Sequence, residues 1–237
     1  MGDLRSFPRG GLAVIVGAGG AIGQALSARL AADKSFGKVA GFSRTSTTAL
    51  DVTSEGDVAA AAELVDAIGL PLRLVVDATG FLHGEEMSPE KSWRQIDARH
   101  MAHAFAVNAI GPALLMKHLL PRLAPDGKSV FATLSAKVGS IGDNRLGGWY
   151  SYRASKAALN QIVRTAAIEL RRRAPESIAV ALHPGTVASA LSAPFGKGGL
   201  EVRSPSLAAA QLLTVIDGFT AAASGGFFDY RGEALPW

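Results

Sequence analysis

The stretch Leu12-Ala13-Val14-Ile15-Val16-Gly17-Ala18-Gly19-Gly20-Ala21-Ile22-Gly23 decides the fold of this chain. Its first five residues form a continuous apolar run, which is typical of a strand buried on both faces. Apolar residues then recur at helical spacing, at Ile22, Ala25, Leu26 and Leu30. The stretch therefore predicts a buried strand, a tight glycine-rich turn and an amphipathic helix.

The glycine-rich turn is a candidate phosphate site. Glycines at such a turn let a pyrophosphate approach the backbone, and the N-terminus of the following helix faces the phosphate charge. A P-loop would end in Gly-Lys-Ser/Thr, but Gln24 follows Gly23 here. Any sharp strand-to-helix turn could use glycines, yet the position after the first buried strand favours dinucleotide binding.

Strand and helix patterns alternate along the rest of the chain. We expect further strands at 39–42, 49–52, 72–76, 130–134, 178–182 and 227–230. We expect helices after an N-cap at Ser54, at about 89–123 with a break near Gly111-Pro112, and at 151–172 and 207–216. Because no composition break marks a second domain, the pattern predicts one α/β domain over 1–237, a doubly wound parallel sheet of about seven strands with helices on both faces.

The composition excludes several classes of protein. The 237 residues include no cysteine, which rules out disulfides, a thiol nucleophile and thiolate metal sites. Residues 1–9 lack the apolar run of a signal peptide, and no stretch reaches the roughly 18 uncharged apolar residues of a membrane span. We therefore expect a cytoplasmic protein without a membrane partner.

The charge pattern does not favour nucleic-acid binding. The net charge is a mild +4, and the one dense basic run, Arg171-Arg172-Arg173, ends a helical pattern where cations suit the helix dipole. His100 and His103 could share a helix face, but no third ligand is near in sequence, so we expect no metal site. Ser135 is not in a Gly-x-Ser-x-Gly elbow, which argues against a serine hydrolase.

The segment after the second strand indicates which cofactor binds. An NAD site needs an acidic residue about 20 positions after the glycine turn, but 37–50 contains none. Ser43-Arg44-Thr45-Ser46 stands there instead, and a guanidinium would pair with a 2′-phosphate. Arg44 could be an ordinary loop arginine, but we expect NADP(H) rather than NAD(H).

One lysine lies on the core-facing stripe of the helix expected at 151–172. Stepping back from Val163 at helical intervals gives Leu159, Lys156 and Tyr152. Lysine is rarely buried, although it could snorkel past the end of the helix. Its ammonium could instead push the phenol of Tyr152 toward the ionised form and make it a proton donor and acceptor near neutral pH.

These residues resemble the YxxxK signature of the short-chain dehydrogenase/reductase family, whose other landmarks occur here in the expected order. They are the glycine turn, Asp77-Ala78-Thr79-Gly80 in place of the NNAG stretch, Asn108, and His183-Pro184-Gly185-Thr186-Val187. The resemblance spans nearly the whole chain and implies a Rossmann-like fold. The segment between Ser135 and Tyr152, and the tail 225–230, resemble the C-factor-like and sniffer-like carbonyl reductase branch.

The resemblance implies a role for each matching position. Tyr152 would exchange a proton with a small-molecule carbonyl or alcohol substrate, Lys156 would hold the nicotinamide ribose and lower the pKa of Tyr152, Asn108 would support a water relay, and Ser135 would hydrogen-bond the substrate oxygen. The implied cofactor-binding positions are Gly17, Gly19, Gly20, Ile22, Gly23, Ser43, Arg44, Asp51, Val52, Ala78, Gly80, Tyr152, Lys156, Pro184, Gly185 and Val187.

Some features leave the function open. Ser135-Ala136 replaces the family's usual serine pair, so the register of the catalytic serine is an expectation, with Ser140 as the alternative. Residues 188–205 are expected to form a mobile substrate lid. The family commonly forms homodimers or homotetramers. Its branch also includes signalling proteins, so an NADP-binding signalling protein with little catalysis is the alternative to a reductase.

Overall fold

The computed structural model describes residues 4–84, 86–195 and 201–237. Residues 1–3 of the N-terminal segment and 196–200 of the expected lid lie outside the described residues. The main sheet contains six strands in the order β2-β1-β3-β4-β5-β8, and every neighbouring pair is parallel. These strands are β1 (Gly11–Val16), β2 (Phe36–Phe42), β3 (Leu72–Asp77), β4 (Ser129–Leu134), β5 (Ser177–His183) and β8 (Phe227–Asp229).

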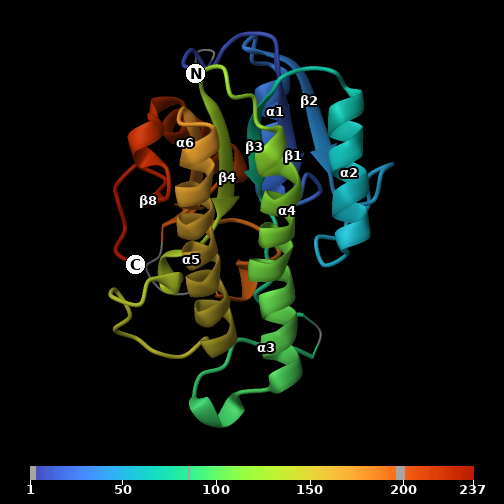
Figure 1. Ribbon diagram of the computed structural model, residues 1–237. Helices are drawn as coiled ribbons and strands as arrows, with labels where there is room; N and C mark the ends of the chain where they lie inside the picture. The colour runs from blue at the N-terminus through green and yellow to red at the C-terminus, as the bar shows by residue number, and fades with distance from the viewer. Residues whose placement is uncertain (1–3, 85, 196–200) are drawn as a thin grey trace.

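Helices cover both faces of this sheet (Figure 1). They are α1 (Ala21–Ala31), α2 (Glu55–Ala67), α3 (Ala98–Phe105), α4 (Gly111–Leu119), α5 (Tyr150–Arg173) and α6 (Pro205–Gly218). The apolar faces of α1 and α6 pack on one side, while α2, α4 and α5 pack on the other. The parallel, doubly wound α/β fold is therefore confirmed.

The first strand shows how the sequence builds these two layers. Leu12, Val14 and Val16 face the core under α2, α4 and α5, whereas Ala13 and Ile15 face the core under α1 and α6. Successive side chains of a strand point to opposite faces, so a strand covered on both sides must be apolar throughout. All six residues of β1 are buried.

The strand predicted at 49–52 does not form, which is why the main sheet has six strands rather than about seven. Only an isolated bridge joins Ser43 to Ala49. Asp51 instead accepts hydrogen bonds from the backbone N and Oγ1 of Thr53, which bend the chain toward α2. Ser54 then caps α2 by accepting from Asp57 N, as predicted. A separate two-stranded parallel sheet consists of β6 (Thr186–Val187) and β7 (Val202–Arg203).

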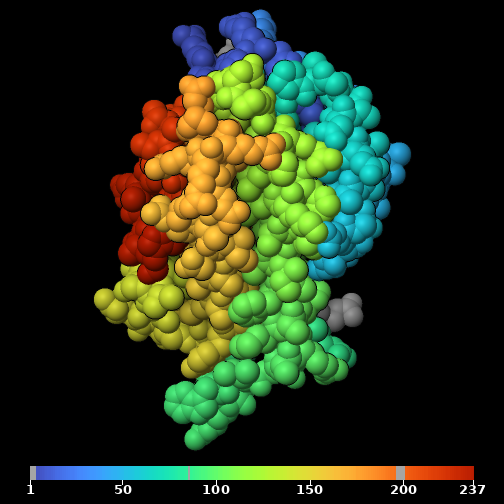
Figure 2. All heavy atoms as spheres, in the orientation of Figure 1, coloured from blue at the N-terminus to red at the C-terminus, as the bar shows by residue number. Residues whose placement is uncertain are grey.

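The long helical region predicted at 89–123 begins later and is not broken at Gly111-Pro112. It starts at Ala98, after a short 3₁₀ turn at Trp93–Gln95, and passes through a π-helical segment, η2 (Ala106–Ile110), into α4. Pro112 directly follows this π-helical segment, whose wider turn interrupts the regular i→i−4 hydrogen bonding, so the helix continues past the proline. The run α3–η2–α4 lies beside α5 along one face of the molecule (Figure 2).

Within the described residues, Ala98–Arg122 is the one helix long and apolar enough to cross a membrane by length and composition alone. The core helix of a globular domain passes the same test. Here Leu115, Met116 and Leu119 of this helix pack into the core beneath the sheet, which accounts for its apolar composition.

The chain order creates a crevice above the sheet. In the sheet, β2 pairs with one edge of β1, and the chain then crosses over so that β3 pairs with the other edge of β1. The connections therefore diverge at the carboxyl ends of β1 and β3, which is where open parallel sheets bind ligands. The glycine turn follows β1 directly, and 78–81 follows β3.

Candidate active site

The glycine turn is fixed by close backbone contacts. Gly17 has φ 82°, and a Cβ there would lie 2.9 Å from the carbonyl carbon of Ala78. A Cβ at Gly23 would lie 2.1 Å from the carbonyl oxygen of Gly17, so any side chain would separate α1 from the turn. No side chain caps α1, and its first turn carries no acidic residue. Its N-terminal N–H groups are therefore available to an anion.

A cavity of about 410 Å³ lies over this turn and holds most of the predicted cofactor positions. Its lining includes Gly17, Gly19, Gly20, Ser43, Arg44, Asp51, Val52, Ala78 and Gly80. The guanidinium of Arg44 forms no hydrogen bond or ion pair with any described residue. Hydrogen bonds from Thr53, together with the charges of Arg44 and His103, lower the pKa of Asp51. The rim of the cavity thus offers an uncommitted cation.

A second cavity, of about 440 Å³, adjoins the first and contains the predicted chemical groups. Gly20, Arg44 and residues 78–81 line both cavities. Ile22, Ser135, Tyr152, Lys156 and Pro184 line the second alone. Residues from the segments after β1 and β3, from the end of β4 and from α5 therefore meet along one groove at the carboxyl edge of the sheet.

Lys156 is buried, as its place on the core stripe predicts. Its side chain is almost fully buried, and Nζ donates a hydrogen bond to the carbonyl oxygen of Leu134 at 2.7 Å. Nζ also lies 6.0 Å from the centroid of the Tyr152 ring. Burial lowers the pKa of Lys156 to about 8, against an opposing effect of the Asp77 carboxylate.

The pKa of Tyr152 shifts in the direction opposite to that predicted. Burial raises it to about 12 in the protein alone. In the protein without cofactor, burial therefore outweighs any lowering of this pKa by Lys156. The ammonium is committed to a backbone carbonyl and lies over the ring, so the cost of desolvating a phenolate outweighs its attraction. The protein alone holds Tyr152 as a neutral phenol at pH 7.

Asn108 lies behind the groove rather than in its lining. Its Oδ1 accepts from Phe81 N, while its Nδ2 donates to Phe81 O and to Ser155 Oγ, at 2.8, 2.8 and 3.1 Å. Ser155 Oγ in turn donates to the carbonyl oxygen of Tyr152. The side chain of Asn108 therefore ties the loop after β3 to the helix that carries Tyr152. A Cβ at Gly80 would lie 3.7 Å from Asn108 Oδ1 and 3.9 Å from Lys156 Nζ.

Asp77 occupies the position of the first asparagine of the family's NNAG stretch. This buried carboxylate accepts hydrogen bonds from Thr79 N, Thr79 Oγ1 and Thr133 Oγ1, at 3.0, 2.6 and 2.7 Å. A buried carboxylate is costly without partners, and three donors satisfy this one. The departure from the family pattern thus preserves a tight turn after β3.

Ser135 lines the groove, but its hydroxyl group has a partner in the protein. Its Oγ donates to Oδ1 of Asn160 at 2.7 Å, and Nδ2 of Asn160 is buried without a hydrogen-bond partner. Ser140, the alternative, points elsewhere. Its Oγ donates to the carbonyl oxygen of Trp237 at 3.3 Å and accepts from Asp143 N. The geometry therefore places Ser135, and not Ser140, at the groove.

The segment after β5 contributes less to the groove than the resemblance implies. Pro184 lines it, but Gly185 and Val187 do not. Gly185 has φ 76°, and a Cβ there would meet the guanidinium of Arg203 at 2.1 Å. That guanidinium stacks on the ring of Tyr230, 3.5 Å from its centroid, and so fixes this segment from behind.

Aromatic residues that no sequence motif marked form a wall beside Tyr152. The ring of Trp149 lies 6.2 Å from Tyr152 and 5.2 Å from Phe195, and His83 lies 5.4 Å from Phe195. His83 Nε2 is also 3.1 Å from the carbonyl oxygen of Ala190. His83 lines the second cavity together with Phe81, Ser189, Ala190 and Leu191, whereas Trp149 and Phe195 pack behind that lining. Phe195 falls in the segment expected to form the substrate lid, whereas His83 and Trp149 carry no periodic signal and only the folded chain reveals them.

The fold and the site define an α/β oxidoreductase of the dehydrogenase and reductase type, and comparison with known proteins agrees. Residues 21–205 match the family described as enoyl-(acyl carrier protein) reductase. The chain is 38% identical to the C-signal of Myxococcus xanthus over 144 residues, which cover 60% of this chain and 81% of that protein.

Two further comparisons extend the likeness. The chain is 33% identical over 189 residues to 1-hydroxy-2-glutathionyl-2-methyl-3-butene dehydrogenase of Rhodococcus sp. (strain AD45), covering 79% and 78% of the two chains. The crystal structure of NADPH-bound carbonyl reductase from chicken fatty liver has the same fold, with a TM-score of 0.83, 23% identity, and 98% and 96% coverage. The chain belongs to the short-chain dehydrogenase/reductase family and is an oxidoreductase that transfers a hydride.

Proposed function

We propose that this protein interconverts a carbonyl compound and its alcohol with NADP(H), and that Tyr152 is the general acid and base. One observation carries the proposal: Tyr152, Lys156 and Ser135 line a cavity that adjoins the glycine turn and the uncommitted Arg44. The two cavities together would accommodate a dinucleotide whose reactive end lies beside the phenol of Tyr152.

The residues present fit a phosphorylated dinucleotide. The uncapped N-terminus of α1 and the glycine turn would hold the pyrophosphate, and Arg44 would pair with a 2′-phosphate. Asp51 and Val52 would flank the adenine, and Lys156 would hold the nicotinamide ribose. The bound nicotinamide supplies the hydride chemistry. The chicken liver relative holds NADPH, which supports the same choice here.

The raised pKa of Tyr152 keeps its phenol protonated at neutral pH, which is the form that carbonyl reduction needs. Burial raises this pKa to about 12, so the phenol keeps its proton and can donate it to the oxygen of a substrate carbonyl. Lys156, with a pKa lowered to about 8, is poised to replace that proton. Alcohol oxidation requires the phenolate, which the protein alone disfavours.

Ser135 would orient the substrate carbonyl by donating a hydrogen bond to its oxygen. The hydroxyl must first leave Oδ1 of Asn160, which it now contacts. Phe81, Ala190 and Leu191 in the lining favour apolar or moderately polar carbonyl compounds, because these side chains offer no charge to the substrate. We also propose a cytoplasmic location, as expected from the sequence, and a homodimeric or homotetrameric state, as the family resemblance implies.

The test is the oxidation of NADPH against a panel of aldehydes, ketones and quinones, with NADH as the alternative cofactor. Substrate-dependent oxidation of NADPH, abolished in Tyr152→Phe, is the expected result. Tight NADPH binding without turnover of any carbonyl on the panel would overturn the enzymatic proposal.

That second outcome would favour an NADP-binding signalling protein with little catalysis. Two observations keep this candidate open. The chain is 38% identical to a protein named C-signal, and the hydroxyl of Ser135 is committed to Asn160 rather than free in the groove. The intact Tyr152 and Lys156 pair argues against it.

A further inference from the structure

The helix that carries Tyr152 begins without a capping side chain of its own. Trp149 occupies the N-cap position of α5 and makes no side-chain cap hydrogen bond. Its φ of 52° is left-handed, the only positive value at a non-glycine position among the described residues. A helix start leaves backbone N–H groups without partners, and left-handed backbone is strained for a bulky residue. Something outside α5 must hold this start in place.

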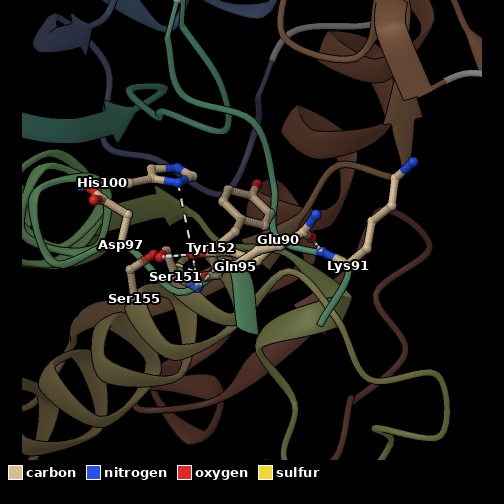
Figure 3. Close-up of polar contacts among 8 residues, drawn as sticks. All are labelled: Glu90, Lys91, Gln95, Asp97, His100, Ser151, Tyr152 and Ser155. Atoms are coloured by element: carbon tan, nitrogen blue, oxygen red, sulfur yellow. Dashed lines mark hydrogen bonds and ion pairs between the residues drawn. The ribbon is translucent and has the colours of Figure 1, made fainter. Parts of the chain in front are cut away.

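Glu90, from the loop before α3, holds it at two points (Figure 3). Its carboxylate accepts hydrogen bonds from Ser151 N, at 3.3 and 3.2 Å to the two oxygens, and from Ser151 Oγ. Its backbone carbonyl accepts from Trp149 N. Glu90 therefore fixes the strained residue before the helix and the second residue within it.

The surroundings of Glu90 are built for a buried carboxylate. Glu90 is only 2% exposed, and its Oε1 lies 3.7 Å from Nδ1 of His100, which is also buried. The N-terminus of α5 adds the positive end of its helix dipole. Asp97 fixes His100 in turn by accepting from its backbone N at 2.8 Å. Since an unpartnered buried carboxylate is costly, these contacts keep Glu90 in one position.

The residues that Glu90 holds are adjacent to the reacting group. Ser151 directly precedes Tyr152, and the ring of Trp149 lies against those of Tyr152 and Phe195. In Figure 3 the Glu90, His100 and Ser151 side chains gather beside Tyr152. A shift at the start of α5 would therefore move the phenol and the aromatic wall together.

We propose that Glu90 is a positioning residue for Tyr152, which acts by capping the catalytic helix from a distant loop. This inference rests on the proposed function, because it assigns a role relative to Tyr152. Misplacement of a reacting group by about 1 Å can cost about 100-fold in rate, so small displacements at this cap suffice.

The first test compares Glu90→Gln with Glu86→Gln, an exposed glutamate in the same segment that serves as the matched control. Glu90→Gln should lower kcat for carbonyl reduction by about tenfold or more while the Kd for NADPH stays within about twofold. The glycine turn and Arg44 come from other elements, and Lys156 is held separately by its hydrogen bond to Leu134 O, so cofactor affinity should be spared. Glu86→Gln should leave both unchanged. An unchanged kcat in folded Glu90→Gln would overturn the proposal.

A second measurement separates positioning from simple stabilisation and does not depend on turnover. Amide hydrogen exchange at Ser151 and Tyr152 should quicken by about tenfold in Glu90→Gln, because hydrogen bonds to charged groups are worth more than neutral ones. If the unmodified protein reduces no carbonyl but amide exchange still quickens in Glu90→Gln, the proposed function is wrong while the capping role of Glu90 is supported. If exchange is unchanged, the cap itself is wrong.

Ser151→Ala keeps the test decisive should Glu90→Gln fail to fold. It removes one of the donors to Glu90 and leaves the backbone N–H in place, so kcat should fall by a smaller factor. Glu90→Asp retains the charge and should recover part of the loss. In a merely structural role, both variants would lower the melting temperature and leave the kcat of the folded fraction unchanged, which would overturn the proposal.

Discussion

The Ser135 hydroxyl lies 2.7 Å from Oδ1 of Asn160 on the neighbouring helix α5, and Nδ2 of the same amide is buried without a partner. The hydroxyl proton is therefore directed away from the groove. If the amide turned so that Nδ2 donated to Ser135 Oγ, the hydroxyl proton would be free for a substrate oxygen. The orientation of Asn160 thus decides whether Ser135 can donate to a substrate.

Asn160→Asp should therefore impair catalysis. A carboxylate only accepts, so it would hold the Ser135 proton permanently, and we expect kcat to fall by about tenfold or more. Asn160→Leu, of similar size, removes the acceptor and should cost less turnover. Steady-state kinetics at matched melting temperatures would check this, and an Asn160→Asp enzyme as fast as the unmodified one would contradict it.

Replacing the two candidate serines should have separate effects. Ser135→Ala should lower kcat by about 10² to 10³, the usual effect of losing one donor to a reacting oxygen, and leave NADPH binding intact. Ser140→Ala should instead loosen the chain around Trp237 and lower the melting temperature. Should Ser140→Ala be the more damaging to kcat, the assignment of Ser135 is wrong.

Arg44 should select NADP(H) over NAD(H). Arg44→Asp replaces a cation with an anion at the rim of the cofactor cavity, so NADPH affinity should fall by about 100-fold or more while NADH affinity changes little. Cofactor titrations of both proteins measure this directly. Equal affinity of the unmodified protein for NADPH and NADH would count against the assignment.

The sequence predicts most of this fold because its signals are periodic. The apolar run of β1, the Ser54 cap of α2 and the core stripe of α5 each reflect a local preference that tertiary packing reinforces. The strand predicted at 49–52 fails because Leu50 and Val52 are buried by packing against the helix layer. Alternating burial in a short segment does not by itself indicate pairing with another strand.

The site is less predictable, because its geometry depends on contacts between distant segments. Tyr152 and Lys156 follow from one helix, but Glu90 and Asn160 reach their partners only after folding. The pKa of Tyr152 could not be predicted from its neighbour at helical spacing. Spacing shows that two side chains share a face, but it does not show that Lys156 Nζ bonds Leu134 O.

One buried and one half-buried lysine predict how stability depends on pH. Burial lowers the pKa of Lys128 and of Lys156 from 10.5 to about 8. Between about pH 8 and 10.5 the unfolded chain therefore binds more protons than the folded one, so the free energy of unfolding should rise with pH. Each fully buried group contributes at most about 1.4 kcal/mol per pH unit, and less for the partly exposed Lys128. Urea unfolding of Lys156→Met should show a shallower rise, and an identical slope would refute this assignment.

Tyr152→Phe should abolish carbonyl reduction while it preserves the fold and NADPH affinity. It removes one hydroxyl group and keeps the ring that packs against Trp149. General acid catalysis is worth about 10² to 10⁴-fold, so the loss of kcat should be at least of that order. Tyr150 is the matched control, because its position on α5 turns it to a different face and Ala154, rather than a lysine, lies one turn beyond it.

The pH dependence gives the same hypothesis a second, independent test. Since burial holds the pKa of Tyr152 high, its proton is available for reduction throughout the neutral range, whereas alcohol oxidation should accelerate as pH rises. Lys156→Ala should weaken NADPH binding and move the pH profile of oxidation upward, because it removes the nearest cation. Single-turnover NADPH oxidation by Tyr150→Phe and Tyr152→Phe is the decisive comparison. Near-normal rates for Tyr152→Phe would show that Tyr152 is not the proton donor, and they would overturn the enzymatic function proposed for this groove.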